Sequence, residues 1–113
     1  MHELSIATQI FDLVKKVMKE HSAKRVGEIR VEVGKLSCID PASLRFCFEA
    51  VAADSELAGA HLAIVEKYPR GRCRSCGKEY EVRIDDFRCN HCGSDDLELI
   101  SGSDVLVTEV EVE

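Results

Sequence analysis

Residues 26–55 read VGEIRVEVGKLSCIDPASLRFCFEAVAADS, and the spacing of their apolar side chains changes from a period of two to a period of three to four. In the first part, Ile29, Val31 and Val33 alternate with charged residues, which is typical of a strand with one buried face. Gly34 marks the end of this strand or a bulge in it. The sheet that contains the strand is therefore expected to have one buried face and one face in water.

The second part of this stretch predicts an α-helix from about Pro41 to Ser55. Asp40 is a strong N-cap residue, and proline suits the first helical position. A second strand, HLAIVEKY, follows at residues 61–68, so that a strand, a helix and a strand succeed one another and the two strands are expected to be parallel. The apolar face of the helix consists of Leu44, Cys47, Phe48 and Val51.

Two further elements flank this unit. Residues 4–21 predict an amphipathic helix, because apolar side chains recur on one face. Residues 104–113, DVLVTEVEVE, alternate again and predict a third strand. We therefore expect an α+β fold, a two-layer domain in which two helices cover a three-stranded mixed sheet. The predicted buried stripe of the first helix is Ile6, Ile10, Leu13, Val14 and Val17, and the third strand is expected to place Leu106, Thr108, Val110 and Val112 on one face.

Residues 70–101 interrupt this domain with two Cys-x-x-Cys pairs, CRSCG and CNHCG, which are twelve residues apart. Gly77 and Gly93 permit the left-handed backbone that such turns require. Four thiolates favour a tetrahedral Zn(II) ion, and a site that is closed by four protein ligands is structural. We expect residues 1–69 plus 102–113 to form one domain and residues 70–101 to form an inserted zinc-ribbon module. The expected zinc ligands are Cys73, Cys76, Cys89 and Cys92.

Three alternatives exist for this cysteine module. A thioredoxin-like redox motif would need only one Cys-x-x-Cys pair, and an iron centre could use the same four thiolates. The third alternative is a zinc ribbon that binds nucleic acid or acts as a protein adaptor. Residues 67–88 favour it, since seven basic and four acidic residues give them a net charge of +3. The aromatic side chains that could stack on bases there are few, namely Tyr68, Tyr80 and Phe87.

The composition argues against general nucleic-acid binding and against a membrane protein. The chain of 113 residues carries a formal net charge of −6, whereas nucleic-acid binding requires a basic face. It has no apolar run of about 18 residues and no pattern of a signal peptide, so a cytoplasmic location is expected. Cysteines in that compartment are more often metal ligands or thiols than disulfides. Outside the module, Cys47 is expected in the core, and Cys38 receives no role.

The sequence begins Met1-His2-Glu3. The amine of Met1, the backbone nitrogen of His2 and the His2 imidazole lie within chelating reach of one another, and the backbone nitrogen or carboxylate of Glu3 could add a fourth donor. Planar nitrogen coordination suits Ni(II) or Cu(II), whereas Zn(II) prefers a tetrahedron. Spacing alone does not separate such a site from a functionless surface start. His91 lies between two expected zinc ligands and receives no assignment.

Taken together, the Met-His-Glu start, the stretch GKLSCIDPASLRFCFE, the four-cysteine module and the acidic final strand resemble the HypA/HybF family of hydrogenase-maturation nickel metallochaperones. The resemblance covers essentially the whole chain. It implies a carrier, not an enzyme, which binds Ni(II) and delivers it with a partner GTPase, HypB, to the large subunit of a NiFe-hydrogenase; some members also serve urease. It further implies that His2 is the essential nickel ligand, with Met1 and Glu3 in the same site and Asp40 as its support. A monomer and a homodimer both remain open.

Overall fold

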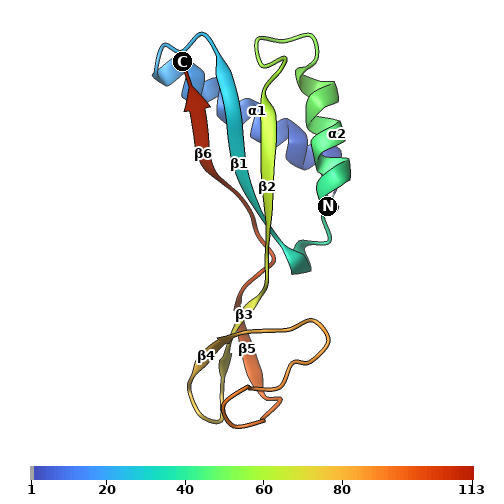
Figure 1. Cartoon of the computed structure of the whole chain (residues 1–113), viewed down its shortest axis with the longest axis vertical. Coiled ribbons are helices and arrows are strands. Elements are labelled where there is room, and N and C mark those ends of the chain that lie inside the picture. Colours follow the sequence, from blue (N-terminus) through green and yellow to red (C-terminus); the bar gives the residue numbers. More distant parts are fainter. Residues whose placement is uncertain (1) are drawn as a thin grey trace.

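In the computed structural model, which describes residues 2–113, two three-stranded sheets lie end to end along the longest dimension of 52 Å (Figure 1). No helix in this described range is long and apolar enough to cross a membrane. The elements in chain order are α1 (Glu3–Glu20), β1 (Val26–Gly34), the 3-10 turn η1 (Lys35–Ser37), α2 (Pro41–Ala52), β2 (His61–Lys67), β3 (Arg70–Cys73), β4 (Glu79–Glu81), β5 (Leu97–Ser101) and β6 (Val105–Val112).

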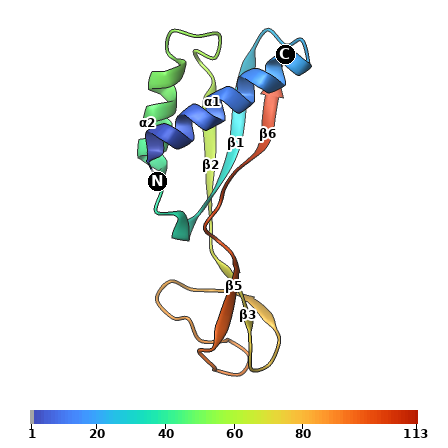
Figure 2. The ribbon, with the colours of Figure 1, turned by 180° about the vertical axis from the view of Figure 1, so that it is seen from behind.

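The first sheet has the strand order β2-β1-β6. β1 is parallel to β2 and antiparallel to β6, so the predicted mixed sheet is confirmed. The helices cover one face, with α1 crossing the sheet obliquely (Figure 2). The core contains the predicted residues Ile29, Val31 and Val33 of β1, which are at most 1% exposed, together with Val14 of α1 and Phe48 of α2. The opposite face of this sheet carries charged side chains, including Glu28, Arg30 and Glu109, and residues 2–113 place no helix over it (Figure 2).

α2 ends three residues earlier than the sequence predicts. The helix stops at Ala52, and the backbone N–H and the hydroxyl of Ser55 both donate to the carbonyl oxygen of Ala52, at 3.0 and 2.8 Å. These two bonds close a turn in place of another helical one, since serine competes for backbone hydrogen bonds. Cys47 is half-buried and packs against the core, as expected.

The prediction that Leu106, Thr108, Val110 and Val112 share one face of the third strand is wrong. Val105 and Val107 pack against the core, whereas Leu106 is 53% exposed. The register with β1 shifts near Thr108, so that one residue of β6 is unmatched at this point. Such a bulge reverses the alternation of faces, and Val110 therefore packs against the core although Leu106 does not.

A narrow neck joins the two sheets, where the connection from β2 to β3 passes the connection from β5 to β6 (Figure 1). Gly34 and Gly102 lie so close together that a Cβ atom on Gly34 would collide with the carbonyl of Gly102, and one on Gly102 would collide with Pro69. Two backbone hydrogen bonds join the end of β1 and η1 to the connection from β5 to β6: the N–H of Gly34 donates to the carbonyl oxygen of Asp104 at 2.8 Å, and the N–H of Leu36 donates to that of Gly102 at 2.9 Å. The neck therefore depends on two residues without side chains.

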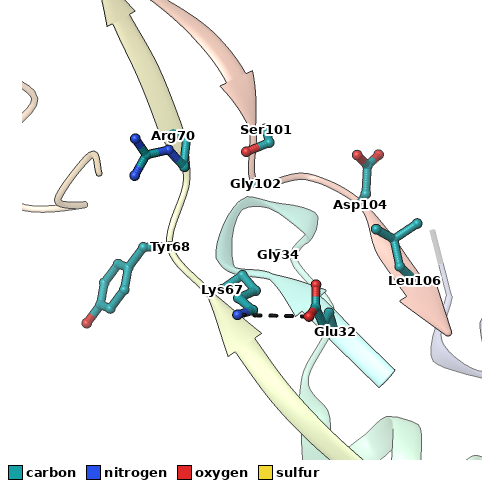
Figure 3. A pocket seen from close by; sticks show the side chains of 9 residues that line it. All are labelled: Glu32, Gly34, Lys67, Tyr68, Arg70, Ser101, Gly102, Asp104 and Leu106. Carbon is teal, nitrogen blue, oxygen red and sulfur yellow. Dashed lines mark ion pairs between the residues drawn. The ribbon is translucent and has the colours of Figure 1, made fainter. Parts of the chain in front are cut away.

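The second sheet has the order β4-β3-β5, and all three strands lie within residues 70–101. Beside the neck is a shallow pocket of about 200 Å³, in which Lys67 forms an ion pair with Glu32 at 3.9 Å (Figure 3). That residues 70–101 form a separate module remains a prediction.

Candidate metal centres

The four predicted zinc ligands lie together at one end of the second sheet. The Sγ atoms of Cys73, Cys76, Cys89 and Cys92 are all within 4.8 Å of one another, and the Cys73–Cys92 and Cys76–Cys89 distances are 3.5 and 3.7 Å. Thiolates at about 2.3 Å from a zinc ion form a tetrahedron with sulfur–sulfur edges of about 3.8 Å. The sulfurs therefore have the spacing of a four-thiolate metal centre. A disulfide, with its S–S bond of about 2.05 Å, would be far shorter.

Two similar turns present these sulfurs. In the first turn, the N–H of Gly77 donates to the carbonyl oxygen of Cys73 at 2.8 Å, and in the second, the N–H of Gly93 donates to that of Cys89 at 2.9 Å. The two glycines have φ angles of +79° and +78°, the left-handed conformation that the sequence predicts. One ligand of each pair is buried and the other is exposed, so the centre lies at the surface end of a small core.

Backbone N–H groups stabilise negative charge on the sulfurs. The N–H of Cys76 lies 3.5 Å from the Sγ atom of Cys73, and this hydrogen bond lowers the pKa of the Cys73 thiol to about 6. The N–H of Ser94 favours the thiolate of Cys92 in the same way, but the hydrogen bond from Cys92 to the Cys73 sulfur keeps its proton and raises the pKa of Cys92 to about 11. A divalent cation that binds here must displace such protons.

Side chains from β4, from the residue after it and from β5 complete the core around the sulfurs. Tyr80 is 4% exposed and Val82 is fully buried, and Leu97 of β5 packs on the same cluster. The Tyr80 hydroxyl donates to the carbonyl oxygen of Phe87 at 3.1 Å, and burial raises the pKa of its phenol. Tyr80, one of the three aromatic side chains that could stack on bases by sequence, is therefore a core residue and is not available for stacking. Its alternation with Glu79 and Glu81 is the signal that could have identified it as a core residue.

The basic residues of the second sheet and its loops are mostly paired with carboxylates. Four arginines form ion pairs at 3.0–3.9 Å, and within residues 2–113 Arg70 and Lys78 have no carboxylate within 4.0 Å. Two of the acidic partners, Asp96 and Glu98, lie beyond the stretch whose net charge is +3 in sequence. The predicted basic patch is therefore largely neutralised, which argues against the nucleic-acid alternative. The pairs are Arg72 with Glu79 and Glu98, Arg74 with Asp96, Arg83 with Asp85, and Arg88 with Asp86.

At the other predicted metal site, His2 is exposed and forms the N-cap of α1. Its backbone is extended, with φ −106° and ψ 141°, and its side chain makes no capping hydrogen bond. The Oε2 atom of Glu3 accepts a hydrogen bond from the backbone N–H of Asp40 at 3.3 Å. The start of α1 therefore touches the start of α2, although 37 positions separate these two residues. Met1, the third residue of the expected nickel site, lies outside the described residues.

Asp40 caps α2 as the sequence predicts. Its Oδ2 atom accepts the backbone N–H of Ser43 at 3.1 Å and the Ser43 hydroxyl at 2.7 Å. The hydroxyl first, and then the N–H, lower the pKa of the Asp40 carboxyl. The structure thus brings Glu3 and Asp40 together. It does not draw His2, Glu3 and Asp40 into a group as close as the cysteines, which form the one cluster of three or more such ligands in the described chain.

The remaining candidates receive no metal role. The His91 side chain is not part of the cysteine cluster, although its backbone N–H lies 3.4 Å from the Cys89 sulfur. Cys38 is exposed and has a φ angle of +62°.

The chain is similar to known proteins over its whole length. Residues 1–112 match the family described as "Hydrogenase/urease nickel incorporation, metallochaperone, hypA". A hydrogenase maturation factor HypA from Chlorobium phaeobacteroides is 36% identical over 113 residues, with both chains fully covered. One from Desulfatibacillum aliphaticivorans is 42% identical, with 99% of this chain and 87% of that protein covered.

Two solved structures share the fold. The solution structure of the Ni metallochaperone HypA from Helicobacter pylori has a TM-score of 0.71 and covers 99% of this chain and 97% of that one. A second solution structure, of a HypA protein, has a TM-score of 0.76 and covers 100% and 97%. Both are 23% identical to this chain, so they establish the similarity of the fold alone.

Proposed function

Because the chain belongs to the HypA family of hydrogenase/urease nickel-incorporation metallochaperones, we propose that it binds Ni(II) at its N-terminus and passes the ion on for the maturation of a NiFe-hydrogenase. A metallochaperone carries a metal and is not an enzyme, so the nickel ion is its cargo. The proposed donors are the amine of Met1, the backbone nitrogen and imidazole of His2, and a fourth donor from Glu3. Three or four nitrogen donors in one plane suit Ni(II).

The observation that carries this proposal is that the His2 side chain is free at the start of α1. The His2 side chain makes no capping hydrogen bond. The first N–H groups of a helix have no acceptor within the helix, so coordination through the backbone nitrogens of His2 and Glu3 breaks no helical hydrogen bond. The imidazole is also exposed, and a receiving protein can therefore replace the donors one at a time.

We assign Glu3 and Asp40 different parts in this site. The Glu3 carboxylate already accepts a hydrogen bond from the backbone N–H of Asp40. The backbone nitrogen of Glu3 is therefore favoured over its carboxylate as the fourth nickel donor. Asp40 supports the site by holding the first turn of α2 in place, through its bonds to Ser43. The contact between Glu3 and Asp40 then fixes the direction in which α1 begins.

We propose that the four cysteines hold a Zn(II) ion. Their spacing fits tetrahedral coordination by four sulfurs, which leaves no open position for a substrate, so the zinc would be structural. Both Cys-x-x-Cys pairs contribute to one cluster, whereas a redox motif would use a single pair. In zinc-finger peptides such a centre contributes about 10–16 kcal/mol of binding free energy, enough to fold a segment whose own core is small.

The family also suggests the partners. We propose that the chain acts with the maturation GTPase HypB and delivers nickel to a hydrogenase large subunit, and that it does so in the cytoplasm, where cysteine ligands stay reduced. Urease maturation is a second possible destination, because the family description names both enzymes.

Nickel titration of the protein with a free native N-terminus tests the proposal. The His2→Ala variant is expected to lose the absorption band of a planar Ni(II) site while it retains one zinc per chain. His21→Ala is the matched control, since His21 is also exposed and lies at the other end of α1. Retention of high nickel affinity in His2→Ala, or its loss in His21→Ala, would show that the proposed site is wrong.

A further inference from the structure

The two edges of the first sheet differ in how they are covered. At the β2 edge, the Nε atom of Arg45 on α2 donates to the carbonyl oxygen of Leu62 at 3.4 Å, so a cationic side chain covers this strand. At the β6 edge, no side chain in the described part of the chain makes a hydrogen bond to the backbone of residues 105–107. Natural proteins usually protect an exposed edge, because its free N–H and C=O groups can pair with another strand.

The register shows which backbone groups of β6 are free. The N–H of Gly34 donates to the carbonyl oxygen of Asp104 at 2.8 Å, and Leu106 lies opposite Glu32 in the same register. Backbone groups alternate in direction along an antiparallel strand, so Leu106 turns its N–H and C=O towards β1. The N–H and C=O groups of Val105 and Val107 therefore point away from the sheet, into open space.

An apolar groove lies along this free edge, between β6 and the helix above it. It has a volume of about 310 Å³ and is lined by α1 and by the first three residues of β6. Leu13, which the sequence places in the buried stripe of α1, is instead 44% exposed and lines this groove. A strand added to β6 would place alternate side chains here, against Ile6, Ile10 and Leu13.

The other face of the same edge carries negative charge. Asp104 and Leu106 lie next to each other at the start of β6, on the open side of the sheet (Figure 3). Beyond the bulge, Glu109 and Glu111 line a second open pocket on this side. Glu109 pairs with Arg30 at 3.6 Å, whereas Asp104 and Glu111 form no ion pair with any residue in the range 2–113. The outward side chains of an added strand would therefore meet unpaired carboxylates.

We propose that the free edge of β6 binds an extended segment of a partner protein as a fourth strand of the sheet. The segment has branched aliphatic residues at alternate positions, which fill the groove under α1, and Lys or Arg between them, which face Asp104 and Glu111. A second copy of β6 does not meet this requirement, because residues 104–113 contain no basic residue. The docking edge does not include the proposed nickel donors. The proposal therefore goes beyond nickel binding and can be tested independently of it.

A synthetic peptide tests the proposal on the full, zinc-loaded chain. The probe is a blocked nine-residue peptide in which Val or Ile alternates with Lys, and the readout is amide hydrogen exchange by NMR. The amides of Val105 and Val107 are expected to become protected on binding, while those of β2 do not change. A peptide of the same composition in scrambled order, and one with N-methylated backbone at alternate residues, are expected not to bind. Equal binding of either control would overturn the proposal, because charge or apolar contact alone would then suffice.

Three variants locate the binding edge. Leu13→Lys places a charge in the groove and is expected to weaken peptide binding about tenfold, the equivalent of one lost apolar contact. Asp104→Lys, at an exposed residue, reverses the facing charge and is expected to weaken it about threefold. Val65→Lys is the matched control on β2, since Val65 is 43% exposed, and is expected to bind as the unchanged protein does.

The remaining outcomes also count for or against the proposed binding edge. If Leu13→Lys does not fold, as judged by circular dichroism, Asp104→Lys alone tests the edge. Unchanged binding in Asp104→Lys, or loss of binding in Val65→Lys, contradicts the proposed location. A concentration-dependent dimer that the peptide dissociates would assign the edge to a second copy and overturn the partner proposal. Nickel titration of the same samples reports on the N-terminal site independently.

Discussion

The four-cysteine cluster and the N-terminal residues are both candidate metal sites, but they are built in opposite ways. The cluster gathers four sulfurs from two turns 13 or more positions apart, encloses two of them in a small core, and stabilises their charge with backbone N–H groups. The N-terminal site consists of consecutive residues at a helix start, and His2 is exposed. We expect the first arrangement to hold its ion, because the fold anchors every ligand. We expect the second to release its ion, because His2 lies on the surface.

The two sheets are expected to respond differently to the loss of metal, because their cores differ in size. The second sheet has a core of only four buried residues, Cys73, Tyr80, Val82 and Cys89, so we expect the proposed zinc ion to supply much of its stability. The first sheet has a continuous aliphatic core that involves neither site. Nickel release should therefore leave the fold intact, whereas zinc release should not.

The largest expected effect is that of Cys73→Ser. This change removes a fully buried ligand and is expected to reduce the zinc content from one per chain to nearly none, with loss of NMR dispersion for residues 70–101. The helical circular-dichroism signal of α1 and α2 should persist. A folded variant that still holds one zinc would contradict the four-thiolate centre, and loss of the helices would contradict the division into two modules.

A second prediction is that acid releases nickel before zinc. Protons compete with nickel for exposed nitrogen donors, whereas four sulfurs that the fold gathers within 4.8 Å of one another bind zinc together, so that protonation of one sulfur leaves three ligands in place. Both metals can be followed during one pH titration, with dialysis and elemental analysis. Release of nickel and zinc at the same pH would contradict the proposed difference in stability between the two metal sites.

A third prediction concerns the neck, which belongs to neither site. Gly34→Val would push a side chain into the carbonyl group of Gly102, and it is expected to reduce the free energy of unfolding by about 1–3 kcal/mol. Gly59→Asn is the control, because Gly59 has open space around it and a φ angle of +88° that asparagine tolerates. Urea denaturation measures both. If the two variants are equally stable, the close approach of Gly34 to Gly102 does not limit which residue can stand at position 34.

The smallest effect is expected at Asp40. Asp40→Asn keeps a good N-cap, so its nickel affinity should match that of the unchanged protein and its Tm should fall less than that of Asp40→Ala, which should be lower by a few degrees. The hydrogen bonds from Ser43 lower the pKa of Asp40, so its carboxylate stabilises the fold above the unfolded pKa of about 3.9, and this contribution is lost as the pH falls through the lower folded value. The difference in Tm from Asp40→Ala should thus be constant above about pH 5 and shrink below it. A loss of nickel affinity in Asp40→Asn would instead make the carboxylate a ligand.

Much of the fold is predictable because it follows from local spacing. The alternation of Ile29, Val31 and Val33, and the cap formed by Asp40, depend on neighbours within a few residues. The errors arise where distant segments meet. The bulge at Thr108 reflects how β6 pairs with β1, and no pattern within DVLVTEVEVE indicates it. Leu13 has the spacing of a core residue, but the sheet ends beside it and leaves it at the rim of a groove.

The candidate sites divide in the same way. Spacing alone selects Cys73, Cys76, Cys89 and Cys92, since a two-residue loop brings two thiolates to one ion wherever it occurs. It cannot show that Arg74 pairs with Asp96, across 22 positions, and so it overstates the basic character of the module. Nor can it show that the backbone of Asp40 binds Glu3.

The sequence by itself determined the helices, the central strand, the metal-binding pattern of the cysteines and, through its resemblance, the family. The tertiary structure decided which residues of β6 face the core, which charges are neutralised, how closely the neck segments approach, and that the edge of β6 remains open. The reason is physical: periodicity and ligand spacing are set by a few covalently linked neighbours, whereas register, ion pairing and edge exposure depend on contacts between segments that are far apart in the chain.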